Sequence, residues 1–396
     1  MAGGLRVAII GYLPLIRREH PAKSLSKLVY YVARTLLRRG CTVDFVPHPS
    51  LEPKYVPGAY FRMGGKLCEV LDYRNLPKGE YDVGLVVASP HMFARSRCLR
   101  AAMAQGVLDG AIEAFRASNP HAKVVLYGTL NYWMMLPASL AEGLRIFDMV
   151  IFYTRYECGM YEELCEEAGV KPVPHTYVTP GVDSSHYTPA PGEGRGNRPF
   201  TVLYVGRNDI VKAPSRILGV ASLLRDLPIK FVLFTSACGF SPVGLLDLTL
   251  LSQSLRLREG EDINFVEEFV EEESMPSVYR AADAFITLSS SEGVCLSMLE
   301  AQACGLPVVA HSLPTLREVY GNSVLWVGSE GVEYYPIGPA PVASVKEAAE
   351  KVRDLYLEEG LRKEYRARSL ENAKRYDWDE SVGPRLKETL ESSLSL

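Results

Sequence analysis

The dominant feature of this sequence of 396 residues is a regular alternation of short apolar runs and longer helical stretches. Continuous apolar runs bounded by turn residues are typical of parallel strands that are buried on both faces. Their alternation with helical patterns predicts βαβ units, and therefore a doubly wound α/β fold. Twelve strands would be unusual in one sheet, so we expect two Rossmann-like domains of six strands each. The expected strands are 5–11, 42–47, 82–88, 123–127, 149–153, 175–179, 201–205, 230–235, 263–266, 284–288, 307–311 and 324–327.

The segment 188–199 (TPAPGEGRGNRP) is dense in Pro and Gly and has no apolar period. A new strand-like run begins directly after it, so we interpret it as a linker between an N-terminal domain (1–187) and a C-terminal domain that begins at residue 200. A surface loop within one domain is the alternative. From residue 342 to residue 394 the pattern is helical, and we expect no further strand there.

The composition restricts the class of protein. Lys plus Arg total 43 and Asp plus Glu total 47, which gives a net charge of -4 and argues against wholesale nucleic-acid binding. No apolar run reaches the length of a membrane span, and the N-terminus lacks the features of a secretion signal. The eight cysteines form no CxxC pair, which indicates buried free thiols rather than disulfides or a zinc site. We therefore expect a cytoplasmic protein without a metal centre.

The first expected helix, residues 24–39, combines an apolar stripe with several basic side chains, and Arg17 and Arg18 precede it. One interpretation is a core helix with a solvated basic face. The other is a face that docks on anionic lipid at the inner side of a membrane, or on an anionic acceptor.

The most informative stretch is 289–300 (SSSEGVCLSMLE), which follows the expected strand 284–288 and opens a helix. Glu292 is expected on the strand-to-helix turn at the carboxyl edge of the sheet, where open α/β sheets bind ligands. The N–H groups of residues 295–297 would then face an anion such as a phosphate. Glu300 follows eight residues later, about 12 Å along a helix. A nucleoside diphosphate sugar, which has hydroxyls at both ends and phosphates between, fits this layout. Two solvated helical glutamates are the alternative.

A second element is the stretch 201–212 (TVLYVGRNDIVK), in which a buried strand ends at Gly206 and Arg207, and Lys212 follows five residues later. Glycine lets the backbone approach a ligand, and Arg and Lys can hold phosphates. These cations would stabilise the charge that develops on a departing nucleoside diphosphate. Surface cations in a loop are the alternative.

The motifs, taken in order, resemble the retaining glycosyltransferases of family 4 (glycosyltransferase group 1), which have the GT-B fold. The resemblance covers nearly the whole chain and is strongest from residue 178 to residue 319. The segment 274–310 with its E-x7-E pair is the most specific part. The supporting motifs are FDMVIFYT at 147–154, VTPGVDSSHYTP at 178–189, LYVGRNDIVK at 203–212 and YDW at 376–378.

The resemblance implies two Rossmann-like domains that face each other across a cleft, with nucleotide-sugar binding in residues 200–370. It also implies a C-terminal helix (371–396) that packs back on the N-terminal domain. Glu300 would hold the ribose hydroxyls, Glu292 would contact the donor sugar, and Arg207 and Lys212 would hold the diphosphate. No metal or cofactor would be needed, and the departing phosphate would accept the proton of the acceptor. The residues implied to bind the donor are Gly206, Arg207, Lys212, Glu292, Gly293, Val294, Cys295, Leu296 and Glu300.

The chain also departs from the family pattern. Cys295 stands where a second glycine is common, and the Gly-Gly pair expected before Glu318 is missing. The histidine usual after the fourth strand of the first domain is also missing. His91, after the third strand, is our candidate for an acceptor-side catalytic residue; a half-buried loop histidine is the alternative. Arg17, Arg18 and Tyr132 are candidates for contacts with the acceptor.

We therefore expect an enzyme, a retaining glycosyltransferase of the hexosyltransferase class. It would transfer a sugar from a nucleoside diphosphate sugar to a glycan, a lipid-linked or a small-molecule acceptor. A nucleotide-sugar- or glycan-binding protein of the same fold that has lost turnover is the alternative. A sugar-nucleotide epimerase and a phosphorylase fit the residues less well.

Overall fold

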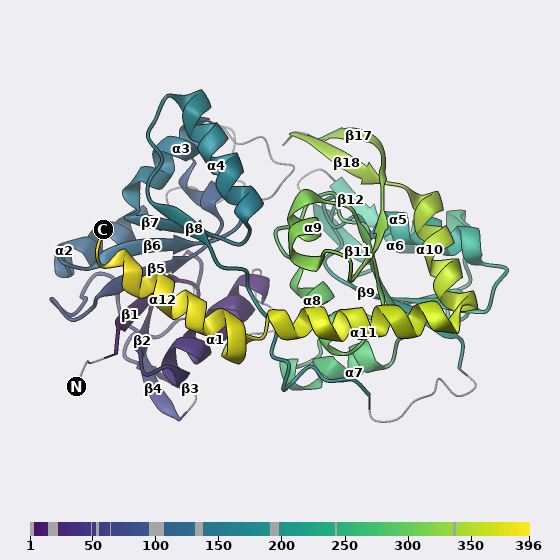
Figure 1. Ribbon diagram of the computed structural model, residues 1–396, viewed down its shortest axis with the longest axis horizontal. Coiled ribbons are helices and arrows are strands. Elements are labelled where there is room, and N and C mark those ends of the chain that lie inside the picture. Colours follow the sequence, from purple (N-terminus) through teal and green to yellow (C-terminus); the bar gives the residue numbers. More distant parts are fainter. Residues whose placement is uncertain are drawn as a thin grey trace. The chain divides into compact units, whose positions relative to one another are not determined.

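A computed structural model describes residues 4–14, 23–48, 50–52, 55–63, 65–94, 107–130, 138–190, 198–241, 244–335 and 338–396. The chain divides into two compact units. Figure 1 shows both units, with labels on most of their helices and strands. Unit 1 comprises residues 1–130, 136–180 and 378–396, and unit 2 comprises residues 131–135 and 181–377. Residues 191–197 of the expected linker lie outside the described part of the chain.

Unit 1 is built on a six-stranded parallel sheet whose strands are mostly buried, except for the half-buried edge strand His175–Tyr177. Buried strands of this kind need apolar side chains on both faces, which the runs supply. In spatial order the strands are β2 (Thr42–Pro47), β1 (Arg6–Gly11), β5 (Val83–Val87), β6 (Lys123–Tyr127), β7 (Met149–Phe152) and β8 (His175–Tyr177). The helices of the unit are α1 (Lys23–Arg38), α2 (Asp109–Ser118), α3 (Ala138–Gly143), α4 (Arg155–Ala168) and α12 (Gly383–Ser393).

Unit 2 repeats this plan with a second six-stranded parallel sheet. Its strands, in spatial order, are β13 (Ile263–Phe265), β10 (Ile229–Phe234), β9 (Phe200–Val205), β14 (Ala284–Thr287), β15 (Val308–His311) and β16 (Leu325–Val327). Its helices are α5 (Pro214–Leu224), α6 (Leu248–Ser254), α7 (Met275–Arg280), α8 (Leu296–Ala303), α9 (Pro314–Tyr320), α10 (Val345–Leu357) and α11 (Glu359–Arg375). The prediction of two sheets with six parallel strands each is confirmed.

Three two-stranded antiparallel hairpins add to the sheets and were not expected from the sequence. The hairpin from residue 329 to residue 343 lies between β16 and α10, so the expected helical stretch begins at Val345 rather than at residue 342, and helices follow it to Ser393. The hairpins are β3 (Tyr60–Met63) with β4 (Lys66–Glu69), β11 (Cys238–Ser241) with β12 (Gly244–Asp247), and β17 (Ser329–Tyr335) with β18 (Gly338–Ala343).

The end of the chain packs against the first helix, and α12 contacts α1 in unit 1 (Figure 1). Trp378 is buried, and its ring stacks on Tyr31 of α1 with ring centroids 5.9 Å apart. The Thr35 hydroxyl donates a hydrogen bond to the Trp378 carbonyl oxygen at 3.1 Å. A Cβ atom at Gly383 would collide with the Thr35 hydroxyl, so the contact requires glycine there. Residues 378–396 are thus part of the core of unit 1.

The basic face of α1 is engaged by the same C-terminal segment. Arg34 and Arg38 form ion pairs with the Asp379 carboxylate, and Arg39 donates to the Asp379 carbonyl oxygen. The C-terminal segment thus supplies a partner for part of the positive charge on α1, and a lipid surface is not needed for that part. Among the described helices, none is long and apolar enough to cross a membrane.

The described cysteines are free thiols, as expected from their spacing. Cys238 is exposed, however, so the expectation that the thiols are buried is wrong for this residue. The cysteines in the described part of the chain are Cys41, Cys68, Cys158, Cys165, Cys238, Cys295 and Cys304.

Candidate functional site

The order of the strands in unit 2 creates a switch point at the carboxyl edge of its sheet. The chain runs from β9 to β10 on one side and later returns to β14 on the other side of β9. Loops that follow β9 and β14 therefore leave the sheet in opposite directions and open a crevice where ligands bind in open α/β sheets. These two loops, 206–213 and 288–295, carry Lys212 and Glu292.

Lys212 and Glu292 form a close ion pair at this switch point. The Lys212 Nζ atom lies 2.6 Å from both carboxylate oxygens of Glu292. The Ser289 hydroxyl donates a further hydrogen bond of 2.8 Å to Glu292 Oε1. Burial lowers the pKa of Lys212, but the Glu292 carboxylate more than compensates, so that the pKa is raised and the ammonium stays charged. The two residues that the sequence assigned to one ligand are thus in direct contact.

The loop that carries Glu292 is held by hydrogen bonds from several directions. The Thr315 hydroxyl donates to the Glu292 carbonyl oxygen at 2.6 Å, and the Tyr320 hydroxyl donates to the carbonyl oxygens of Val294 and Cys295 at 2.7 and 3.0 Å. Thr315 and Tyr320 belong to α9, which occupies the place where the family pattern has a Gly-Gly pair. The helix therefore fixes the loop without the missing glycines.

Glu300 lies on α8 and is buried. It accepts a hydrogen bond of 2.6 Å from the Tyr279 hydroxyl of α7. Because α8 begins at Leu296, Glu292 precedes the helix, and the expected separation of about 12 Å along one helix does not apply. Tyr279 was missed from the sequence, because nothing in the spacing of the two residues marks their contact.

Gly206 and Arg207 follow β9 in the other loop. A Cβ atom at residue 206 would collide with the phenol of Tyr204, whose hydroxyl donates to the Arg207 carbonyl oxygen at 2.9 Å. The guanidinium of Arg207 is 72% exposed and pairs with Asp209 at 2.9 Å. Its charge is near enough to lower the pKa of Lys212, as a minor contribution. The Arg207 side chain is therefore mostly open to solvent, whereas that of Lys212 is only 24% exposed.

The segment of Gly293, Val294, Cys295 and Leu296 joins Glu292 to α8. Gly293 and Val294 are buried, and Cys295 is the N-cap residue of α8 with φ at 57°. This left-handed conformation favours glycine, which is the residue that the family pattern commonly has there. Burial raises the pKa of the Cys295 thiol to about 12, so the sulfur is a neutral group beside the Lys212–Glu292 pair.

The acceptor-side candidates belong to unit 1 where the structure describes them. His91 follows β5 in a short 3-10 helix (Pro90–Phe93) and is buried, and its Nε2 atom has no hydrogen-bond partner. Burial lowers the pKa of His91 to about 4, so its ring is neutral at neutral pH. Arg17, Arg18 and Tyr132 lie outside the described residues.

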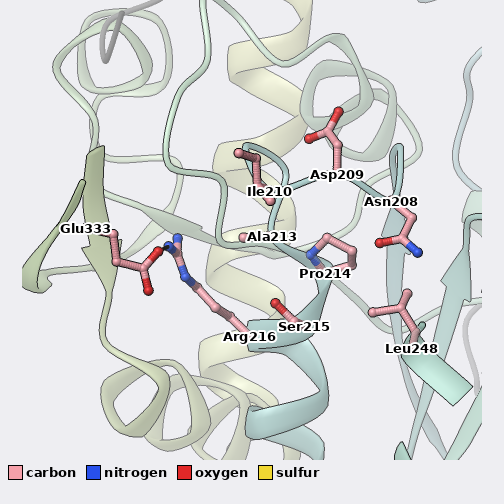
Figure 2. A pocket seen from close by; sticks show the side chains of 9 residues that line it. All are labelled: Asn208, Asp209, Ile210, Ala213, Pro214, Ser215, Arg216, Leu248 and Glu333. Atoms are coloured by element: carbon pink, nitrogen blue, oxygen red, sulfur yellow. Dashed lines mark hydrogen bonds and ion pairs between the residues drawn. The ribbon is translucent and has the colours of Figure 1, made fainter. Parts of the chain in front are cut away.

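A cavity of about 140 Å³ lies beside the loop that follows β9, and Figure 2 shows the side chains that line it. Lys212, Glu292 and Glu300 do not line it. In the described ranges, no group of three or more His, Cys, Asp or Glu side chains is placed to hold a metal ion. The lining residues of the cavity are Asn208, Asp209, Ile210, Ala213, Pro214, Ser215, Arg216, Leu248 and Glu333.

Comparison with known proteins finds a family similarity in the C-terminal half. Residues 191–375 match the family model of glycosyl transferases group 1. A D-inositol 3-phosphate glycosyltransferase from Salinispora arenicola (strain CNS-205) is 30% identical over 200 residues, which is 46% of this chain and 44% of that protein. The chain thus spans less than half the length of this curated relative.

Solved structures resemble the chain over nearly its full length. Sucrose-phosphate synthase from Thermosynechococcus elongatus has a TM-score of 0.70 at 14% identity, over 99% of both chains. Anabaena HepE in complex with UDP-glucose has a TM-score of 0.65 at 14% identity, over 98% of this chain and 100% of that one. At such identity the likeness shows the fold alone. Residues 191–375 are thus similar to the glycosyl transferases group 1, and the two α/β units of the chain have the GT-B fold.

Proposed function

We propose that the protein is a retaining glycosyltransferase that moves a sugar from a nucleoside diphosphate sugar to a hydroxyl of a glycan, lipid-linked or small-molecule acceptor. The observation that carries the proposal is the contact between Lys212 and Glu292 at the switch point of unit 2. A cation for phosphate oxygens and a carboxylate for sugar hydroxyls are thus neighbours at one place, and a sugar phosphate offers both kinds of partner.

Each of these residues is assigned to one part of the donor. Lys212 and Arg207 would hold the diphosphate, Glu300 the ribose hydroxyls and Glu292 the transferred sugar. In the reaction the bond between the anomeric carbon and the phosphate oxygen breaks, and the acceptor oxygen bonds to the same face of that carbon. The departing phosphate takes the acceptor proton. Lys212 and Arg207 would stabilise the charge that develops on the leaving group, and no step requires a metal ion.

The Lys212–Glu292 pair must rearrange when the donor binds. With the diphosphate beside Lys212, a second anion shares the ammonium, and the Glu292 carboxylate becomes available to sugar hydroxyls. Charged hydrogen bonds of this kind contribute about 1.5–3 kcal/mol each. The pair thus keeps both charges compensated in the absence of donor and exchanges partners in its presence.

We assign the acceptor site to unit 1, with His91 as the candidate catalytic residue on the acceptor side. Peripheral membrane contact through residues 24–39 does not enter the proposal, because Arg34, Arg38 and Arg39 contact the C-terminal segment. The relative from Salinispora arenicola is named for an inositol phosphate, so inositol phosphates belong among the first acceptors to test.

The experiment is a transfer assay with UDP-, GDP- and ADP-glucose, combined with calorimetry of UDP, GDP and ADP binding. We expect one nucleotide to bind and its sugar to be transferred with retained anomeric configuration. Glu300→Ala should weaken the binding of that nucleotide roughly tenfold or more, and Glu350→Ala, an exposed position on α10, should not. Donor binding without transfer to any acceptor would favour the binding-protein alternative, and no binding of any donor would refute both.

A further inference from the structure

His311 connects the β17–β18 hairpin to the loop that carries Glu292. It is the last residue of β15 and is fully buried. Its Nδ1 atom lies 2.7 Å from the Ser289 carbonyl oxygen, and its Nε2 atom lies 2.9 Å from the Ser329 hydroxyl at the start of β17. A carbonyl oxygen only accepts, so Nδ1 carries the proton and donates. In the neutral ring Nε2 then accepts from the Ser329 hydroxyl.

Arg216 makes a second connection between the same two elements. It lies in the first turn of α5, and its side chain is only 9% exposed. Its Nη1 atom donates to the Leu288 carbonyl oxygen at 2.9 Å and to the Ser290 hydroxyl at 2.8 Å. Its Nη2 atom pairs with Glu333 of β17 at 3.3 Å, and Figure 2 shows this pair at the edge of the cavity.

The two connections meet on three consecutive residues, Leu288 to Ser290. Ser289 lies between the two positions that Arg216 holds, and its own hydroxyl donates to Glu292 Oε1 at 2.8 Å. The direction of that hydroxyl depends on the backbone of residues 288–290, since the side chain has one rotatable bond to its oxygen. Fixing the backbone there fixes one of the two hydrogen-bond donors of the Glu292 carboxylate.

We propose that His311 and Arg216 are positioning residues for Glu292, and that the β17–β18 hairpin is the element that holds them in place. The hydrogen bonds of both residues reach the pair through the backbone of residues 288–290 and the Ser289 hydroxyl. The expected effect of these residues on sugar transfer rests on the function proposed above. Their expected effect on the order of residues 288–290 does not rest on that function.

The test compares variants of the two links with a matched change on the hairpin. His311→Phe removes both hydrogen bonds of the ring, whereas His311→Asn keeps a donor near the Ser289 carbonyl oxygen. Arg216→Met removes the guanidinium. Ser329→Ala removes only the hydrogen bond between His311 and the hairpin. Tyr334→Ala, at an 85% exposed residue of β17, is the control. Ser329 is exposed, so its variant should fold even where a substitution of buried His311 does not.

The first readout is hydrogen–deuterium exchange of residues 285–295 in the full chain without ligand. We expect faster exchange in His311→Phe, Arg216→Met and Ser329→Ala, partial recovery in His311→Asn, and wild-type exchange in Tyr334→Ala. Exchange of residues 123–127 in unit 1 should not change. Unchanged exchange of 285–295 in folded Arg216→Met and Ser329→Ala would overturn the proposal.

The second readout separates binding from transfer. Because Glu292 is assigned to the sugar, the kcat/KM of the best nucleotide sugar should fall roughly 10- to 100-fold in Arg216→Met. The Kd of the corresponding nucleoside diphosphate should stay within about twofold, since its contacts with Lys212, Arg207 and Glu300 remain. An equal loss in both would contradict positioning of Glu292. If the wild-type chain shows no transfer, the function proposed above fails, and the exchange measurement alone decides the positioning role.

Discussion

The hydroxyl of Tyr279 donates a hydrogen bond of 2.6 Å to the buried carboxylate of Glu300, so that α7 fixes a side chain of α8 at the donor end of unit 2. Tyr279 in turn packs edge-to-face on Tyr187, with ring centroids 5.8 Å apart. The Tyr187 hydroxyl donates to Glu272 Oε1 at 2.7 Å. The carboxylate assigned to the ribose is thus held by a chain of aromatic contacts that begins directly before the expected linker.

Tyr279→Phe should weaken binding of the matching nucleoside diphosphate about tenfold. The ring remains, but the carboxylate of Glu300 loses a charged hydrogen bond, whose contribution is about 1.5–3 kcal/mol. Calorimetry with the nucleotide and with its 2′-deoxy form checks the assignment, because the loss should be smaller for the deoxy form. Tyr365→Phe on α11 serves as the control. An equal loss for both nucleotides would show that Glu300 does not read the ribose.

Lys212→Met should destabilise unit 2 by about 3–5 kcal/mol, because it leaves the buried Glu292 carboxylate without its cation. Combining it with Glu292→Gln should recover much of that loss, since the double variant buries no unpaired charge. Urea unfolding, followed by the exchange protection of β9 and β14, measures each free energy of unfolding. Additive losses in the double variant would mean that the two side chains do not compensate each other.

Cys295→Gly should be more stable than Cys295→Ala by about 1 kcal/mol. Both variants remove the thiol, but only glycine adopts a φ of 57° without the steric cost of a Cβ atom. Because both variants lose the packing contacts of the sulfur, this loss does not contribute to the difference between their free energies of unfolding. Urea unfolding of the two variants side by side gives the difference, and equal stability would show that the left-handed conformation carries no strain.

Glu157, a buried residue of α4, should make the stability of unit 1 depend on pH. Burial raises the pKa of Glu157 from 4.5 to about 7. The hydrogen bonds that its carboxylate accepts from Thr129, Thr154 and the Tyr153 amide lower the pKa, but by less than burial raises it. Because the pKa of Glu157 is higher in the folded than in the unfolded state, the protonated carboxyl group contributes fully to the free energy of unfolding below pH 4.5. This contribution is lost as the pH rises towards 7. The loss is on the order of 3 kcal/mol.

The expected result is a free energy of unfolding for unit 1 that falls from pH 5 to pH 7 and then levels off. Glu157→Gln should flatten this part of the curve, and Glu163→Gln, at an exposed position of the same helix, should leave it unchanged. Exchange protection of α4 and β7, measured at several pH values, reports on the unit. A wild-type curve without any fall between pH 5 and pH 7 would contradict the assignment.

The sheets could be predicted from the sequence because strands buried on both faces need uninterrupted apolar runs. β2 and β6 begin and end where the pattern predicts, and the other strands of the sheets differ at their ends by a few residues. The β17–β18 hairpin could not be predicted in this way. β18 contains Pro339 and Pro341, which argue against a strand in a sequence pattern but are tolerated in a two-stranded ribbon with free edges.

The approach of Lys212 to Glu292 could also be anticipated, since both residues follow strands at one sheet edge. The contacts of Tyr279, His311 and Arg216 could not be. They depend on the direction of long side chains across elements that are between 18 and 117 residues apart in the sequence, and a single sequence contains no periodic signal for such pairs. His91 could be placed after its strand, but its burial follows only from packing in unit 1.

The membership of residues 378–396 in unit 1 has a consequence for biosynthesis. Trp378 and α12 complete a core whose first strand is made hundreds of residues earlier, whereas unit 2 is finished once residue 377 has been added. During translation the second half can therefore fold before the first half is whole. A stop codon directly after residue 377 would therefore damage unit 1, which contains the first strand, rather than unit 2.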